Sequence, residues 1–282
     1  MTNTATDIET DDGVSATGTA LDTETTTALD GATTTIYKAE GRHGVADQGK
    51  FVVHIHYPGY LLPEPTDHGY YGLAAVAESF LAPGTWIRLH EHRNDEIISW
   101  VPAGVMRHND RTVGELVADA DHLMVMNAGR SFWHEEQTHA GDPPLRMLQI
   151  FVRPHTADLR PGIQHGPIPA PVTGEWRHLF GPEGASSGGS GAPFTVRNDV
   201  HLYDVRLDEG STVALPDIAG WHTFFHVFEG EVLVDGVRFG QGQSGLIPGP
   251  GGQLVTANGP TTLVAFLIDP AATVTKVGTV GR

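Results

Sequence analysis

Two pairs of potential metal ligands, each pair spaced two residues apart, constrain this sequence more than any other feature. His90 and His92 form the first pair, and His134 and Glu136 form the second, 42 residues after His92. In a β-strand the side chains of residues i and i+2 leave the same face, roughly 6.5 to 7 Å apart, so each pair can point at one ion. Imidazole suits Fe, Ni, Cu and Zn, and a carboxylate added to imidazoles can leave coordination positions open for substrate and O2. The pattern predicts a catalytic metal site.

The composition excludes several classes of partner. The chain has 282 residues and no cysteine, so it is long enough to bury a core without disulfide bonds. Its 34 acidic residues outnumber 17 basic ones, which gives a formal net charge of −17. Such a field disfavours nucleic acid and anionic membrane surfaces, so we expect neither as a partner.

The same composition suggests a salt-rich cytoplasm. Lys38, Lys50 and Lys276 are the only lysines, whereas acidic residues, Thr, Gly and Ala are abundant. Strong ionic screening would relieve the self-repulsion of such a chain, so we interpret this balance as halophilic adaptation. Residues 1–30 lack the basic and apolar regions of a signal peptide, and no apolar run approaches the roughly 20 residues that span a bilayer. We therefore expect a cytoplasmic protein without a membrane segment.

Short apolar runs separated by Gly, Pro, Asn and Asp dominate the chain from Ile36 onward, which predicts an all-β fold. Residues 1–35 carry Thr and acidic residues with few large apolar groups, so we expect a disordered tail. The best helix candidate, residues 73–81, is short and ends at Pro83 and Gly84, and it is equally compatible with a strand.

Two similar halves follow the tail. Residues 184–191 read GASSGGSG and indicate a flexible connector within a linker at 169–193. The segments around Gly104 and Gly230 each read as strand, glycine turn and strand, and the dipeptide Asp235-Gly236 predicts a hairpin. We expect two small β-barrels in tandem, at 36–168 and 194–282.

Histidine pairs also occur by chance in this chain, which has 16 histidines. His54 and His56 form another such pair. His90 and His92 could simply lie on the solvent-exposed face of a half-buried strand. The surrounding sequence favours ligation. Gly84, His90, His92, Glu96 and Gly104 follow the first motif of cupin barrels with one extra residue before the last glycine, and NAGRSFWHEE supplies the third histidine of the second motif.

A closer resemblance is to the pirin family. LHEHRNDEIISWVPAGVMRHND resembles its HPH block, and AGRSFWHEE resembles its AGxGxxHxE block. The resemblance covers about residues 37–270 and implies a bicupin of two small β-barrels. It also implies a metal held by His90, His92, His134 and Glu136. Three departures leave these ligands in place: Glu91 for Pro, Ser131 for Gly, and Asp121 where a turn glycine is common.

The fourth ligand has an alternative. Cupins in general use a glutamate at the position of Glu96, whereas pirins use the one after the third histidine, so Glu136 is favoured and Glu96 could instead orient an imidazole. Glu135 should point outward. We interpret His108 and His122 as turn or surface residues.

The second half offers no comparable ligand set. The positions that correspond to the histidine pair hold Pro216 and Ile218, and His222 and His226 are four residues apart. We interpret this half as structural, covering the first barrel with Phe224, Phe225, Val227 and Phe228.

The resemblance implies a quercetin 2,3-dioxygenase-like activity that opens a flavonol, or a related enol or catechol, with O2. The metal would be Fe(II), with Ni, Cu, Mn or Zn as substitutes, and Glu136 or Glu96 would be the base. An aromatic pocket could be lined by five residues: Trp86, Trp100, Trp133, Phe132 and Met126. Phe132 has the strand parity of His134, so it is expected on the metal face.

Two other functions fit the same residues. Resemblance to eukaryotic pirins implies a regulator that senses metal or redox state and binds a protein partner, although the acidic composition argues against partners that are bound to DNA. A metal-free scaffold is the remaining alternative.

Overall fold

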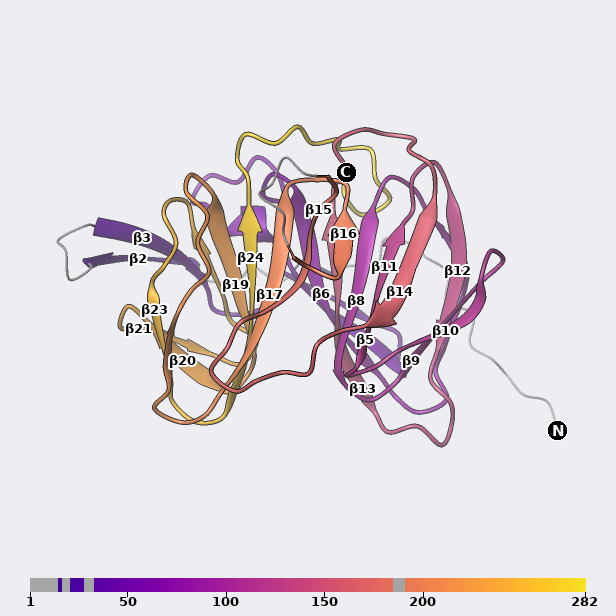
Figure 1. The fold of residues 1–282 in the computed structure, drawn as a ribbon, viewed down its shortest axis with the longest axis horizontal. Helices are drawn as coiled ribbons and strands as arrows, with labels where there is room; N and C mark the ends of the chain where they lie inside the picture. Colours follow the sequence, from indigo (N-terminus) through magenta and orange to yellow (C-terminus); the bar gives the residue numbers. More distant parts are fainter. Residues whose placement is uncertain (1–14, 17–20, 28–32, 185–190) are drawn as a thin grey trace.

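Two β-barrels pack side by side in the computed structural model, which describes residues 15–16, 21–27, 33–184 and 191–282 (Figure 1). Within these ranges the only helical element is a short 3-10 turn, η1 (Pro58–Leu61), and no helix has the length and apolar composition needed to cross a membrane. The predicted all-β fold is confirmed, and residues 73–81 form a strand.

The first barrel consists of an eight-stranded and a four-stranded sheet. The strands of the larger sheet, in spatial order, are β1 (Ser15–Ala16), β4 (Gly44–Asp47), β5 (Phe51–His56), β6 (Leu73–Leu81), β13 (Leu145–Val152), β8 (Glu96–Ala103), β11 (His122–Asn127) and β14 (Gly162–Pro167). Those of the smaller sheet are β10 (Gly114–Ala118), β9 (Met106–Asp110), β12 (Phe132–Gln137) and β7 (Trp86–His92).

The second barrel repeats this plan. Its larger sheet has the order β16 (Phe194–Val196), β15 (Arg177–Pro182), β17 (Val200–Leu207), β24 (Thr261–Ile268), β19 (His222–Glu229), β22 (Ser244–Ile247), β3 (Thr33–Ala39) and β2 (Leu21–Thr27). Its smaller sheet has the order β18 (Thr212–Ala214), β23 (Leu254–Ala257), β20 (Glu231–Val234) and β21 (Val237–Gly240).

The tight turns that the sequence predicts recur at equivalent places in the two barrels. Gly104 lies between β8 and β9 with φ of 89°, and Gly230 lies between β19 and β20 with φ of 83°. A glycine tolerates this left-handed conformation without a steric penalty. Asp235 and Gly236, both with positive φ, connect β20 to β21 as a two-residue hairpin. The internal repeat is therefore real, and the chain is a bicupin.

The prediction that residues 1–35 are disordered is wrong for part of this segment. β2 pairs along its length with β3, from Leu21 opposite Ala39 to Thr27 opposite Thr33. Threonine is a good strand former because its branched side chain suits the pleated surface. The remaining tail residues, 1–14, 17–20 and 28–32, lie outside the described residues.

The predicted domain boundaries also need correction. β3 precedes the first barrel in sequence but pairs with β22 of the second, with Ala39 opposite Ser244, and Ile36 is buried in the second barrel's core. The segment 169–193 is not only a linker, because β15 belongs to the large sheet of the second barrel. Residues 185–190 of the predicted connector lie outside the described residues.

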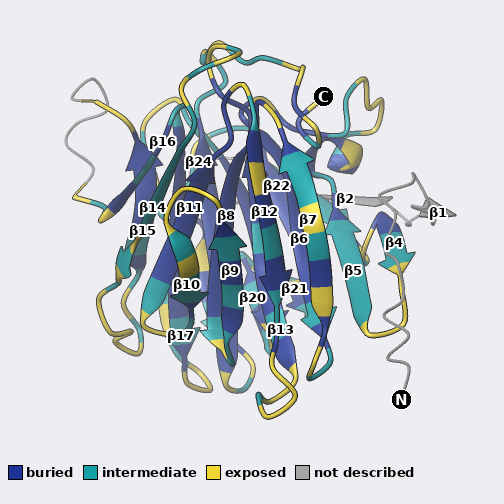
Figure 2. Cartoon of the chain, turned by 90° about the vertical axis from the view of Figure 1, so that its right-hand side faces the viewer, coloured by how far each residue is buried: buried dark blue, intermediate teal, exposed yellow. Residues whose placement is uncertain are grey.

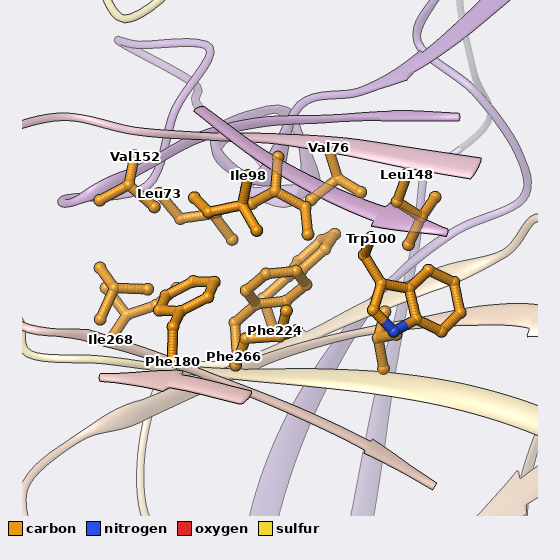
Figure 3. Packing of buried hydrophobic residues seen from close by; sticks show 14 of the residues in the cluster. Leu73, Val76, Ile98, Trp100, Leu148, Val152, Phe180, Phe224, Phe266 and Ile268 are labelled. Atoms are coloured by element: carbon orange, nitrogen blue, oxygen red, sulfur yellow. The ribbon is translucent and has the colours of Figure 1, made fainter. Parts of the chain in front are cut away.

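The most extensive apolar cluster lies between the two barrels rather than inside either one. Figure 3 shows Ile98 and Trp100 of the first barrel facing Phe224 and Phe266 of the second. Strand alternation explains this arrangement, because every second residue of a large sheet points out of its own barrel. Phe224 and Phe228 face the first barrel, whereas Phe225 and Val227 pack inside the second. The prediction that these four residues cover the first barrel is thus right for two of them.

We predict that this interface makes the two barrels unfold as one unit. Truncating Phe266 to Ala removes a fully buried ring from it and should lower the free energy of unfolding by about 3 to 5 kcal/mol. Guanidinium titration followed by fluorescence and circular dichroism should give one shifted transition. The control Leu254→Ala removes a side chain that is 48% exposed and should cost under about 1 kcal/mol. Two well-separated transitions would contradict the prediction.

Candidate metal centre

Three of the four predicted ligands, His90, His92 and His134, meet on the small sheet of the first barrel. β7 and β12 are neighbours there, and the register sets His134 opposite His90 (Figure 2). The ring centroid of His134 lies 4.3 Å from that of His90 and 5.3 Å from that of His92. One nitrogen from each ring lies within 4.8 Å of the others, so small side-chain adjustments would bring all three to one ion.

A buried chain of hydrogen bonds orients His134. Its Nδ1 lies 3.2 Å from Nδ1 of His108, and Nε2 of His108 lies 2.8 Å from Oδ2 of Asp110. Asp110 also accepts two backbone N–H bonds through Oδ1, from Thr112 and Val113. A carboxylate only accepts, so His108 donates to Asp110 and accepts from His134. This assignment leaves the lone pair of His134 Nε2 available for a metal.

The unpaired nitrogens of this site fit a metal ion. His134 Nε2 is buried without a hydrogen-bond partner, and unpaired buried polar atoms are rare in folded proteins. His92 Nδ1 is also unpaired, but it lies 3.6 Å from Oδ2 of Asp95. Nδ1 of His90 donates to the carbonyl of Arg88 at 2.8 Å, which leaves the lone pair of its Nε2 available for a metal. Burial, and then the adjacent His92, lower the pKa of His90 to about 4. Burial also holds the pKa of His134 well below its usual range, so both rings are neutral, as ligands must be.

Glu136, the fourth predicted ligand, lies beside the three histidines but is directed differently. Its Oε1 is 3.8 Å from His134 Nδ1 and accepts a hydrogen bond from Gln149 Nε2 at 3.0 Å. It groups with His108 and His134 rather than with His90 and His92. The carboxyl is buried, and burial raises its pKa to about 7 although the Gln149 amide acts in the opposite direction. It therefore exchanges a proton more readily near neutral pH than an exposed glutamate.

Glu96 lies elsewhere, which corrects the alternative that it contacts the metal or an imidazole. It is fully buried, and its carboxylate accepts hydrogen bonds from Arg197, including Nη2 at 2.6 Å, and from Asn127. Glu96 has the parity of Ile98, whose side chain faces the second barrel. Its role is to bind Arg197 across the interface.

His108 was wrongly expected at a turn or on the surface. It lies in β9, is fully buried, and faces Glu136 in the register with β12. Met106 is the only apolar residue in the segment MRHND, so the sequence has no apolar alternation that would mark His108 as buried. His122 is a surface residue, as predicted, and pairs with Asp119 at 2.9 Å.

A cavity of about 770 Å³ lies beside the histidines and runs along β7, the edge strand of its sheet. The C-terminal segment closes one side of it, because Val280 lines the cavity and its backbone N–H donates to Asp95 at 3.0 Å. No sequence motif predicts this return of the chain to the first barrel. The residues that line the cavity include Ile87, Leu89, His90, His92, Trp133, Glu136 and Val280.

The predicted aromatic lining is correct in part. Trp133 lines the cavity, and Phe132 is buried with its ring centroid 6.4 Å from that of His134, as its parity predicted. Trp100 belongs instead to the interface between the barrels, and Trp86 is 48% exposed. Trp86 donates to Glu135, which points outward as expected.

Two of the departures from the pirin motifs contact each other at the cavity. Ser131 Oγ donates to Glu91 Oε1 at 2.5 Å, and Arg93 Nε donates to the same oxygen at 3.0 Å. Glu91 lines the cavity, so this pair adds a polar group at its edge. Neither residue takes the place of a predicted ligand.

Comparison with protein families gives two consecutive matches. Residues 64–152 match the family described as Pirin, and residues 185–266 match the quercetinase C-terminal cupin domain. A protein of Mycobacterium tuberculosis named "Putative quercetin 2,3-dioxygenase" is 28% identical over 212 residues, which are 74% of this chain and 79% of the relative. The quercetin 2,3-dioxygenase of Escherichia coli K12 is 22% identical over 175 residues, 62% of this chain and 73% of that protein.

Solved structures share the fold. The bacterial pirin YhhW of Escherichia coli in complex with nickel(II) aligns with a TM-score of 0.70 at 19% identity, covering 84% of this chain and 100% of that one. A quercetin 2,3-dioxygenase from Acinetobacter baumannii aligns with a TM-score of 0.69 at 16% identity, covering 83% and 79%. With two barrels of matching topology and a cluster of histidines in the first, the chain belongs to the pirin family of bicupin proteins.

Proposed function

We propose that this protein is a metal-dependent dioxygenase that cleaves a flavonol, or a related enol or catechol, with O2. The observation that carries the proposal is the convergence of three imidazoles, with free and buried nitrogen atoms, beside a largely apolar cavity. A cavity of about 770 Å³ suits a small aromatic molecule. Relatives named quercetin 2,3-dioxygenase support this substrate class.

We propose that His90, His92 and His134 hold the metal and that Glu136 supplies the fourth ligand. Fe(II) is the proposed ion, with Ni, Cu, Mn or Zn as substitutes, because imidazole and carboxylate accept all of them. Nickel in the related YhhW structure supports binding of a divalent ion in this family. Bound there, the metal would lower the pKa of a coordinated hydroxyl and promote its reaction with O2.

The residues around the cavity would bind the substrate and accept its proton. Ile87, Leu89 and Trp133 offer apolar surface to a planar ring system and exclude water from it. Glu136 faces the same cavity, and its carboxylate is in position to take the proton of the substrate hydroxyl. The Gln149 amide donates to Glu136 at 3.0 Å and holds the carboxylate at the wall of the cavity, from which it would turn toward the three imidazoles to act as a ligand.

Oxygen uptake tests the activity directly. Protein purified anaerobically, loaded with Fe(II) and mixed with quercetin should consume O2, and His92→Ala should abolish uptake because it removes one ligand. The control His122→Ala, which removes a surface histidine, should leave the rate unchanged. The activity proposal fails if the wild-type protein binds metal tightly but none of the flavonols and catechols tested causes it to consume O2. That result would support the metal-sensing alternative.

Glu136→Gln tests the proposed base. The amide cannot accept the substrate proton, so kcat should fall about 10²- to 10⁴-fold, while the three histidines still retain metal. Glu135→Gln is the matched control, because Glu135 is the neighbouring carboxylate and points out of the site. Steady-state oxygen uptake and metal analysis measure the two effects separately. A Glu136→Gln rate within threefold of wild type would rule out this role.

Asp110→Asn tests the hydrogen-bond chain behind His134. The asparagine amide would donate to His108 Nε2, which reverses the chain and puts a proton on His134 Nε2, the atom that should bind metal. Metal affinity should therefore fall about 10- to 100-fold, measured by competition with a chelator. Asp119→Asn makes a similar change beside the surface residue His122 and should not alter affinity. Equal affinities for the two variants would contradict the proposed relay.

A further inference from the structure

A second group of potential ligands lies between the two barrels, on strands other than β7 and β12, which carry His90, His92 and His134. His56 of β5 and Glu78 of β6 come from the first barrel, and His226 of β19 comes from the second. One ligand atom from each side chain lies within 4.8 Å of the others. His56 is 1%, Glu78 3% and His226 0% exposed. The three side chains are therefore buried between the packed sheets.

Strand alternation explains why these three side chains meet. His226 lies between Phe224 and Phe228 in the set of β19 residues that face the first barrel. Glu78 has the parity of Val76, which also faces the interface. The polar group thus continues the face that carries the interfacial apolar cluster.

Several nitrogens of this group have no partner. Both ring nitrogens of His56 and Nε2 of His226 are buried without a hydrogen bond. The imidazole ring centroids of His56 and His226 are only 4.4 Å apart, and His56 Nε2 is 3.9 Å from Glu78 Oε2. Unpaired buried polar atoms are rare in folded proteins, so three in one place require an explanation.

The surroundings prepare His226 and Glu78 as ligands. Ser244 Oγ lies 3.0 Å from His226 Nδ1, and donation from that nitrogen to the hydroxyl leaves Nε2 with a free lone pair. Burial, and then the neighbouring His56, hold the pKa of His226 well below its usual range, so the ring is neutral. Burial alone would raise the pKa of Glu78, but its neighbours, among them the guanidinium of Arg146, lower it to about 2.

Arg146 limits which cations this group could hold. Its Nε donates to Glu78 Oε1 at 2.5 Å, which leaves Oε2 directed toward His56, and its guanidinium lies 4.0 Å from the centroid of the Phe228 ring. The guanidinium offsets the carboxylate charge, so electrostatic attraction alone would not hold a dication here. Binding must come from the imidazoles, which favours late transition metals over Ca²⁺ and Mg²⁺.

A cavity next to His56 and Glu78 gives water and ions access to the group. A cavity of about 290 Å³ is lined by His56 and Glu78 together with Arg42, His54, Phe80 and Gln241. Two imidazoles and one carboxylate leave a fourth position of a tetrahedral ion for water from this cavity. Ligand atoms around such an ion lie roughly 3.4 Å apart, so the side chains need to close by about 1 Å.

We propose that His56, Glu78 and His226 form a second metal site, specific for Zn²⁺ and similar late transition metals, that joins the two barrels. The ion would pair the free nitrogens of both histidines and connect β5 and β6 of one barrel to β19 of the other. The site is independent of the proposed dioxygenase activity.

Cobalt(II) is the probe that tests this proposal, because its visible spectrum reports imidazole coordination. Wild-type protein from which metal has been removed should bind two Co²⁺ per chain. His92→Ala and His226→Gln should each bind one, and the double variant should bind none. Added Zn²⁺ should raise the Tm of His92→Ala, which retains only the interface site, and should not raise that of the double variant. The control His122→Gln changes a surface histidine outside both sites and should keep both ions.

Two results would overturn the proposal. One is a wild-type stoichiometry of a single ion that His92→Ala eliminates; the other is an unchanged stoichiometry in His226→Gln. Near-UV circular dichroism establishes that each variant is folded. Should His226→Gln not fold, Glu78→Gln, which keeps the shape of the side chain, takes its place with the same expected loss of one ion. Loss of the oxygen-uptake activity alone would bear on the first site and not on this one.

Discussion

Packing of the two large sheets against each other is the interaction on which the rest of the structure depends. It buries large apolar side chains from both barrels, and several polar side chains on the same face pair across it. Trp100 donates to Asp204 at 3.0 Å, and Glu96 pairs with Arg197. Either barrel alone would expose this apolar face and leave the carboxylate of Glu96 without its cation, which is costly for a buried charge. Docking of the second barrel therefore stabilises the first.

The sequence was sufficient for the parts of the fold and site that follow from local spacing. Histidines two residues apart on one strand must share a face, so His90 and His92 could be placed together without knowledge of the fold. The Asp235-Gly236 hairpin was likewise predictable, because few dipeptides adopt two successive positive φ angles. The parity argument that separates Phe132 from Trp133 was correct for the same reason.

Features that depend on pairing between distant strands could not be predicted in this way. Glu96 has the motif position of a cupin ligand, but its partner Arg197 lies 101 residues later in the other barrel. His108 follows a turn glycine, and only its register opposite Glu136 reveals that it supports His134. β3 pairs with a strand that follows it by about two hundred residues. No local pattern encodes such contacts, because they arise from the order of strands in the sheets.

The two barrels differ in which face of their strands carries chemistry. In the first barrel the small sheet supplies inward imidazoles from β7 and β12, whereas the equivalent strands of the second, β18 and β23, hold only Thr, Val, Ala and Leu. The second barrel instead keeps its polar residues on the outward face, where Arg197, Asp204 and His226 meet the first. A duplicated barrel without an inner histidine cluster can therefore still support the first barrel, because docking fixes the strands that hold the predicted ligands. The C-terminal segment extends this support, since the backbone of Val280 and Gly281 binds Asp95, whose Oδ2 lies 3.6 Å from His92 Nδ1.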